Sequence, residues 1–202
     1  ALLVSALVAW QAASSIGFME YMAKHPGAFF GLVILQFAAV IALAGWVQRM
    51  SAMTAVIIFL GYAALTGLTL STVLLVYTPA SIVQAFLATA AMFGGMSLYG
   101  LFSRRDLSGW GSFLFMSLIG IIVASLINLF LHSPMLDWMV TYGGIVIFAG
   151  LAAYDNQKLK YLSQVQTDEA GFRKLAIHGA LTLYLDFINL FLLLLRTVGD
   201  RR

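Results

Sequence analysis

The chain has 202 residues, of which 62% are hydrophobic and only 9% are charged, and its formal net charge is +3. Soluble domains are about one quarter charged, so this composition excludes a soluble enzyme, a disordered chain and a nucleic-acid-binding protein. The absence of cysteine also excludes disulfides, thiol nucleophiles and thiolate metal sites. The sequence therefore predicts an all-α integral membrane protein.

Seven apolar stretches are long enough to cross a membrane, which takes about 20 helical residues. In chain order they cover residues 1–19, 29–47, 52–77, 80–102, 110–131, 138–154 and 175–195. Charged residues separate most of them, and Thr78-Pro79 divides the third from the fourth because proline disfavours helix in the residue before it. Residues 156–174 are predicted as a polar loop with helical extensions. We expect a single transmembrane domain over residues 1–202, with the start of its first helix missing.

Lysine and arginine gather in alternate loops, which predicts the orientation in the membrane. The loops after the second, fourth and sixth spans contain Arg49, Arg104, Arg105, Lys158, Lys160, Arg173 and Lys174. Cytoplasmic loops are enriched in these residues, so we expect these loops and the N-terminus on the cytoplasmic side. Seven crossings then place the C-terminus outside, although the tail from Arg196 is basic. A re-entrant last segment is the alternative.

The last predicted span carries a polar stripe in an otherwise apolar helix. His178, Thr182, Asp186 and Asn189 follow one another at spacings of four, four and three residues, which places them on one helical face. An ionisable residue inside a membrane is costly and needs a partner, so Asp186 is a candidate functional residue. The stripe is predicted to line an ion path. Hydrogen bonding to neighbouring helices is the structural alternative.

Asp155 ends the sixth apolar stretch and is the candidate partner of Asp186. A surface pair with Lys158, one turn later, is the alternative. Two carboxyl groups within hydrogen-bonding reach share one proton. Without that proton they are two repelling charges, and their oxygens suit a hard cation such as Ca²⁺. Asp155 and Asp186 are therefore predicted as a pH sensor, an ion gate and a Ca²⁺ site.

Other polar residues are candidates for supporting roles. Arg49, at the end of the second span, is predicted either as a counter-ion of the acid pair or as an arginine that reaches the lipid headgroups. Ser125, Asn128 and His132 share a face of the fifth span and are predicted to line the outer half of the path. Asp137 is expected at the outer surface.

Two segments near the C-terminal end have a distinctive sequence, YDNQKLK at 154–160 and LYLDFINLF at 183–191. They resemble the Bax inhibitor-1 family, also called the transmembrane Bax-inhibitor-motif family, in its bacterial inner-membrane, YbhL-type branch. The resemblance covers essentially the whole chain. It implies a seven-helix bundle with the last helix central, located in the inner membrane, and a pH-dependent calcium leak. It also places the paired aspartates of the family at Asp155 and Asp186.

The leading hypothesis is a passive, pH-sensitive Ca²⁺ leak channel that has no enzymatic activity and no cofactor. Its partners are the lipid bilayer and calcium ions. An intramembrane aspartyl protease also uses two aspartates, but Asp186 stands in LYLD where such enzymes have GxGD, and no PAL triplet follows. A third hypothesis is an interaction protein that binds other membrane proteins and modulates membrane proteases or stress responses.

Overall fold

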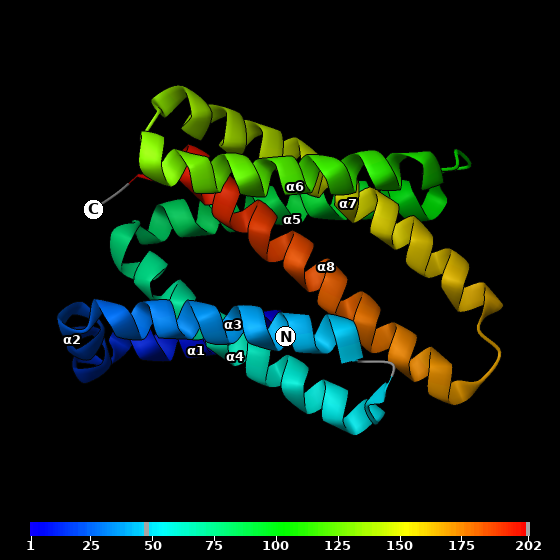
Figure 1. Ribbon diagram of the computed structural model, residues 1–202, viewed down its shortest axis with the longest axis horizontal. Coiled ribbons are helices and arrows are strands. Elements are labelled where there is room, and N and C mark those ends of the chain that lie inside the picture. The colour runs from blue at the N-terminus through cyan, green and yellow to red at the C-terminus, as the bar shows by residue number, and fades with distance from the viewer. Residues whose placement is uncertain (47–48, 201–202) are drawn as a thin grey trace. The chain divides into compact units, whose positions relative to one another are not determined.

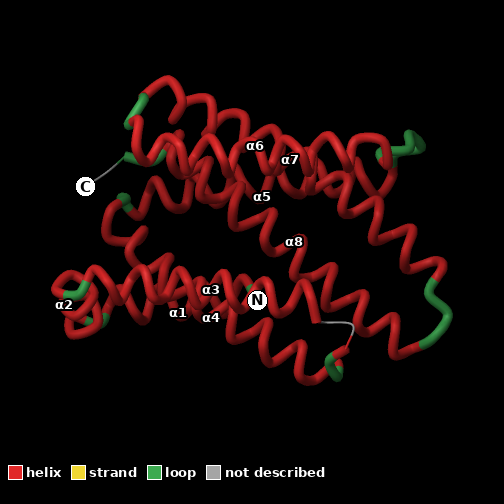
Figure 2. Tube along the Cα trace, viewed as in Figure 1, coloured by secondary structure: helices red, strands yellow, loops and turns green. Residues whose placement is uncertain are grey.

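The computed structural model describes residues 1–46 and 49–200, and these residues form helices joined by short loops (Figure 2). The helices of the described residues are α1 (Leu2–Ser14), α2 (Ile16–Lys24), α3 (Pro26–Trp46), α4 (Ala52–Val76), α5 (Pro79–Phe102), α6 (Ser108–Leu131), α7 (Pro134–Val165) and α8 (Glu169–Val198). The prediction of an all-α membrane protein is confirmed, because the six helices α3 to α8 are long and apolar enough to cross a membrane.

The first predicted span is not one continuous helix. α1 and α2 are bent by 83° at a break, so together they form either a broken span or a re-entrant segment. Ser15 stands at the break in an extended conformation, and its side chain accepts a hydrogen bond from the Phe18 amide. A serine in this position caps a new helix, which explains why the helix predicted over residues 1–19 breaks here. The count of seven spans stays a prediction.

The polar segment 156–174 is almost entirely helical. α7 continues to Val165 and α8 begins at Glu169, so only three residues lie between them. The helical extensions predicted for this segment are confirmed, and the loop between them is shorter than expected. Glutamine, lysine and leucine, which dominate this stretch, have high helix propensity, so the helix continues after the apolar residues end.

The chain divides into two compact units, within each of which the residues contact one another. Unit 1 contains Ala1–Pro79 and Thr167–Leu181 together with the chain end from Asp200, and unit 2 contains Ala80–Gln166 and Thr182–Gly199. α8 therefore contributes its first part to unit 1 and the remainder to unit 2. The prediction of a single domain stays a prediction.

In unit 1, α1, α3 and α4 pack side by side (Figure 1). A Cβ atom on Gly67 of α4 would lie 2.6 Å from the Ser5 carbonyl oxygen of α1, so the two backbones approach closely. The Ser5 hydroxyl donates a hydrogen bond to the Ala63 carbonyl over 2.7 Å. Gln36 of α3 donates to the Thr66 hydroxyl over 2.9 Å. Small residues and polar contacts of this kind hold helices together in lipid.

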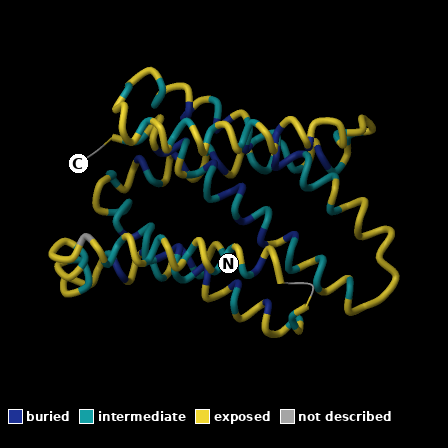
Figure 3. The backbone as a smooth tube through the Cα atoms, viewed as in Figure 1, coloured by how far each residue is buried: buried dark blue, intermediate teal, exposed yellow. Residues whose placement is uncertain are grey.

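In unit 2, α6, α7 and α8 share an apolar core. The cluster consists of Leu114, Ile145, Phe148, Leu151, Leu190 and Leu194. Glycines let two helices approach α7 near its middle: a Cβ atom on Gly100 of α5 would lie 2.1 Å from the Ala153 carbonyl oxygen, and one on Gly111 of α6 would lie 2.5 Å from the Tyr154 ring. Figure 3 shows buried positions along the middle of α7 and along α8. This packing fixes the turn of α7 that carries Asp155.

Candidate functional site

α7 and α8 cross unit 2 in opposite directions, and this arrangement brings their acids together. Leu151 of α7 and Leu190 of α8 belong to the same buried cluster. Further along, a Cβ atom on Gly144 would lie 2.8 Å from a terminal methyl group of Leu193. Asp155 follows Leu151 by four residues and Asp186 precedes Leu190 by four, so both acids lie one turn beyond the leucine contact on the same side of it.

The side chain of Asp186 is hydrogen-bonded to the side chain of Asp155. Asp186 is only 5% exposed, and Asp155 is partly buried. Carboxylate oxygens only accept hydrogen bonds, so a bond between two carboxyl groups requires that one of them carries a proton. The structure thus brings the two predicted acids together in an arrangement that depends on one proton.

The second oxygen of Asp186 is the unusual atom of this pair. Oδ2 is buried and receives no hydrogen bond from any residue that the structure describes. The neighbouring Phe187 is also buried, and its ring contacts Phe86 and Phe93 of α5 with centroid distances of 5.8 and 5.4 Å. A buried carboxylate oxygen without a donor is costly. The pair therefore sits in an apolar setting that disfavours two negative charges.

Two amides that the sequence analysis overlooked hold the same turn of α7. Asn156 donates to the Ser97 hydroxyl of α5 over 2.9 Å, and also to the Ala152 carbonyl over 2.7 Å. Gln157 accepts from the Leu107 amide over 2.8 Å. The signal was present in the sequence, since these two amides directly follow Asp155 where the apolar stretch ends.

Lys158, the alternative partner of Asp155, has another neighbour. Its Nζ atom lies 5.7 Å from the centroid of the Tyr154 ring. A cation at this distance from an aromatic face is attracted by the ring quadrupole. The geometry accordingly places Asp155 with Asp186 and Lys158 with Tyr154.

The other residues of the polar stripe do not all join the pair. Asn189 donates to the Leu185 carbonyl of its own helix over 2.8 Å, which neither the ion path nor hydrogen bonding to a neighbouring helix predicted. Thr182 lies one turn before Asp186 in unit 2, whereas His178 belongs to the part of α8 in unit 1. Arg49 is exposed and also belongs to unit 1. The path-lining roles of the stripe and the counter-ion role of Arg49 stay predictions.

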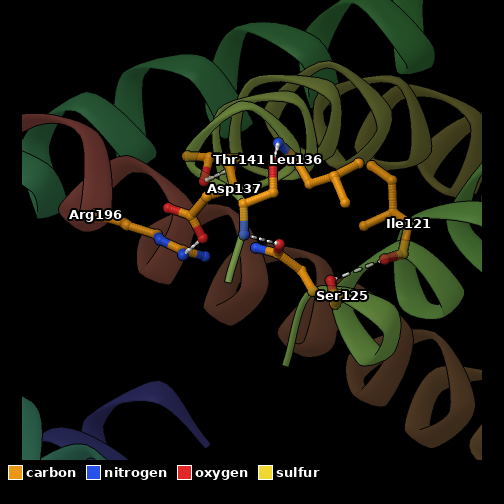
Figure 4. A network of polar contacts seen from close by, with 8 residues as sticks. Ile121, Ser125, Leu136, Asp137, Thr141 and Arg196 are labelled. Carbon is orange, nitrogen blue, oxygen red and sulfur yellow. Dashed lines mark hydrogen bonds and ion pairs between the residues drawn. The ribbon is translucent and has the colours of Figure 1, made fainter. Parts of the chain in front are cut away.

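At the other end of the α7–α8 pair, Arg196 forms an ion pair with Asp137 (Figure 4). Their side chains are 39% and 44% exposed. A pocket of about 530 Å³ adjoins this ion pair, and its polar lining consists of Ser125, Asn128, His132, Ser133, Asp137 and Arg196. Three of these residues, Ser125, Asn128 and His132, are the ones that the sequence placed together. The contact of Asp137 with Arg196 was not predicted.

The hydrogen bonds at this pocket are mostly local. Asn128 accepts from the Ser133 amide over 2.8 Å, and Ser125 donates to the Ile121 carbonyl over 2.8 Å. Thr141 donates to the Asp137 carbonyl over 2.8 Å. The bond between Asn128 and Ser133 spans the turn between α6 and α7, whereas the other two lie within one helix each. Beside this turn the side chain of Asp137 points toward Arg196 (Figure 4).

A resident metal ion does not fit the acid pair well. Ca²⁺ takes six to eight oxygen ligands, and no group of three or more His, Asp or Glu side chains able to hold a metal occurs in the described part of the chain. Two carboxylates can contact a passing cation but supply too few ligands for a closed site.

Comparison with known proteins identifies the family. The family model for the inhibitor of apoptosis-promoting Bax1 matches residues 1–202. The chain is 54% identical to the inner membrane protein YbhL of Escherichia coli K12, over its whole length and 87% of that protein. It is 42% identical to an uncharacterized protein of Borreliella burgdorferi with the same coverage, and 50% identical to one of Rickettsia prowazekii over 76% of this chain and 65% of that one.

The inner-membrane relative and the apolar helices together support a multi-pass protein of the inner membrane. Both segments that carry the resemblance, at 154–160 and 183–191, lie within the matched range. The chain belongs to the Bax inhibitor family of membrane proteins.

Proposed function

We propose that this protein is a passive, pH-sensitive cation leak channel of the inner membrane and that Ca²⁺ is the transported ion. The observation that carries the proposal is the hydrogen bond between the side chains of Asp155 and Asp186, of which Asp186 is almost fully buried. The ion moves down its gradient, so the function needs neither a cofactor nor an enzymatic step.

Protonation determines whether the carboxyl groups of Asp155 and Asp186 are hydrogen-bonded or repel each other. At low pH the shared proton joins the two carboxyl groups, and the pair carries one negative charge. At higher pH the proton is lost, the hydrogen bond disappears, and two negative charges repel each other in an apolar setting. α7 and α8 then separate at this point, and the freed carboxylate oxygens attract a hard cation. The channel is thus closed at low pH and open at higher pH.

The pocket beside Asp137 supports a polar entrance at the other end of the same helices. Its lining includes Asn128 and His132, which can contact a hydrated ion. Between this pocket and the acid pair lies the leucine and phenylalanine core of unit 2. In the closed state this apolar stretch blocks the passage of ions.

The ion pair of Arg196 also supports seven crossings with the C-terminus outside. Asp137 lies in the first turn of α7 and Arg196 in the last turn of α8, so the end of α8 lies beside the beginning of α7. A re-entrant last segment would return α8 to the side from which it starts. Because Asp137 neutralises the charge of Arg196, this arginine contributes little to any preference of the C-terminus for the cytoplasmic side. α8 also has the largest buried share of the six long helices in the described residues, 44%, which supports a central last helix.

Calcium flux into dye-loaded proteoliposomes between about pH 5 and 8 tests the proposal, since a shared carboxyl proton is expected to leave in this interval. Flux through the unaltered protein should rise at least about tenfold across the interval, and Asp155→Asn and Asp186→Asn should both lose this rise. Glu169→Gln, which removes an exposed acid paired with Arg173, is the matched control and should keep it. Flux no greater than in empty liposomes at every pH would overturn the proposal.

A further inference from the structure

A second pocket of unit 2 lies where the α5–α6 loop meets α7. Its volume is about 690 Å³, and its lining contains the four cations Arg104, Arg105, Lys158 and Lys160. We propose that this pocket binds the phosphate group of an anionic phospholipid. Basic pockets at the ends of membrane helices are suited to such headgroups. This inference does not depend on the proposed channel function.

The charges of the pocket favour an anion. Asp106 is the acid in its lining, and hydrogen bonds from the side chain and the backbone of Ser108 lower the pKa of Asp106, which is therefore ionised at neutral pH. Four cations and one anion leave a net charge of about +3. Among residues 1–46 and 49–200, none of the four cations is in an ion pair with a carboxylate, so their charge is available to a ligand.

Hydrogen bonds from α7 hold the loop in place and preform the pocket. Gln157 accepts from the Leu107 amide over 2.8 Å and donates to the Arg105 carbonyl over 2.9 Å. Lys160 donates to the Leu101 carbonyl at the end of α5 over 2.6 Å. The arginines therefore lie on a loop whose backbone is fixed on both sides, and a ligand need not order it on binding.

The surroundings indicate a lipid as the source of the phosphate. Phe102, Trp110 and Tyr161 flank the pocket with exposed fractions of 78%, 59% and 71%. Tryptophan and tyrosine rings, such as those of Trp110 and Tyr161, are enriched where a membrane protein meets the headgroup layer. α5 ends and α6 begins beside the loop, so acyl chains can lie along the apolar surfaces of these helices while the phosphate contacts Arg104 and Arg105.

Native mass spectrometry of the full chain in detergent tests the proposal with phosphatidylglycerol and phosphatidylcholine of identical acyl chains. We expect phosphatidylglycerol to bind at least about tenfold more tightly than phosphatidylcholine. Each cation near a membrane surface contributes about a fivefold preference for anionic lipid, so Arg104→Gln with Arg105→Gln should weaken phosphatidylglycerol binding about 25-fold. Arg173→Gln with Lys174→Gln removes the same charge from an exposed segment and should change the binding less than about twofold.

Three results would overturn the proposal. The first is equal binding of the two lipids to the unaltered protein, and the second is an equal loss in both double variants, because surface charge alone would then explain the binding. The third is displacement of phosphatidylglycerol by millimolar inorganic phosphate, which would make free phosphate the ligand. If the double arginine variant does not fold, Lys158→Gln alone should weaken phosphatidylglycerol binding about fivefold, and an unchanged affinity would likewise overturn the proposal.

Discussion

Among the described residues, α7 and α8 meet at two polar contacts of opposite character. Asp155 and Asp186 are both acids, and Asp186 is 5% exposed. Asp137 and Arg196 are an acid and a base, 44% and 39% exposed. An acid–acid contact persists only while it holds a proton, whereas an acid–base contact persists across the neutral range and is weakened mainly by salt. In the proposed channel, one end of this helix pair therefore responds to pH while the other keeps the helices together.

The largest expected effect follows from making the two contacts alike. Asp155→Lys replaces the acid–acid contact by an acid–base contact that needs no shared proton, so calcium flux at pH 8 should fall at least about tenfold, to the level at pH 5. Proteoliposome flux measures this directly. A lysine is longer than an aspartate, so Asp155→Asn serves as a second variant of nearly unchanged size. The asparagine amide can donate a hydrogen bond to Asp186 at any pH. Flux that still rises with pH in both variants would contradict the assignment of the switch.

The helix packing beside the acid pair should be the least tolerant of added volume. Gly100→Ala places a Cβ atom 2.1 Å from the Ala153 carbonyl oxygen, a backbone atom that cannot rotate away. We expect a loss of about 2 kcal/mol in the free energy of unfolding, as for overpacking elsewhere, measured by thermal or denaturant unfolding in detergent. Gly94→Ala on the same helix meets no atom within 4 Å and is the matched control. Equal stability of the two variants would show that α5 does not approach α7 this closely.

Nearer the Asp137–Arg196 ion pair, a glycine-to-alanine substitution in α7 should reduce the free energy of unfolding by less. Gly144→Ala places a Cβ atom 2.8 Å from the terminal methyl group of Leu193, and a flexible side chain can move aside. The expected loss is about 1 kcal/mol, at the low end for overpacking. The same unfolding measurement compares it with Gly100→Ala, and a larger loss for Gly144→Ala would reverse the proposed difference between the two ends.

The smallest effect is expected at the ion pair. Arg196→Gln should reduce the free energy of unfolding by no more than about 1 kcal/mol, because partly exposed ion pairs contribute little. The difference from the unaltered protein should shrink further in about 1 M salt, where charges are screened within roughly 3 Å. Unfolding at low and high salt measures both effects. A loss above about 3 kcal/mol would instead indicate that this pair is essential to the fold.

The spans could be predicted from the sequence because an uncharged stretch of membrane length has few alternatives. Asp186 was found in the same way, as a single charge in a leucine-rich stretch. The break at Ser15 could not be found, since one more small polar residue in an apolar run gives no distinct signal. A helical extension after residue 154 was predicted, but its end at Val165 was not. Hydropathy reports which residues lie in lipid, whereas helix formation in this polar stretch follows from backbone propensity.

By itself, the sequence determined that the protein is helical, that it belongs in a membrane and which of its acids are costly to bury, because these properties depend on the chemistry of each residue and its near neighbours. Asp155 and Asp186 were predicted as partners, but only the tertiary structure brings them together and pairs Asp137 with Arg196. Arg196 and Asp137 are 59 residues apart in the chain, and Asp155 meets Asp186 because α7 and α8 pack in opposite directions on one leucine core. Pairing over such separations depends on the register in which helices pack, and that register is a property of the whole assembled unit.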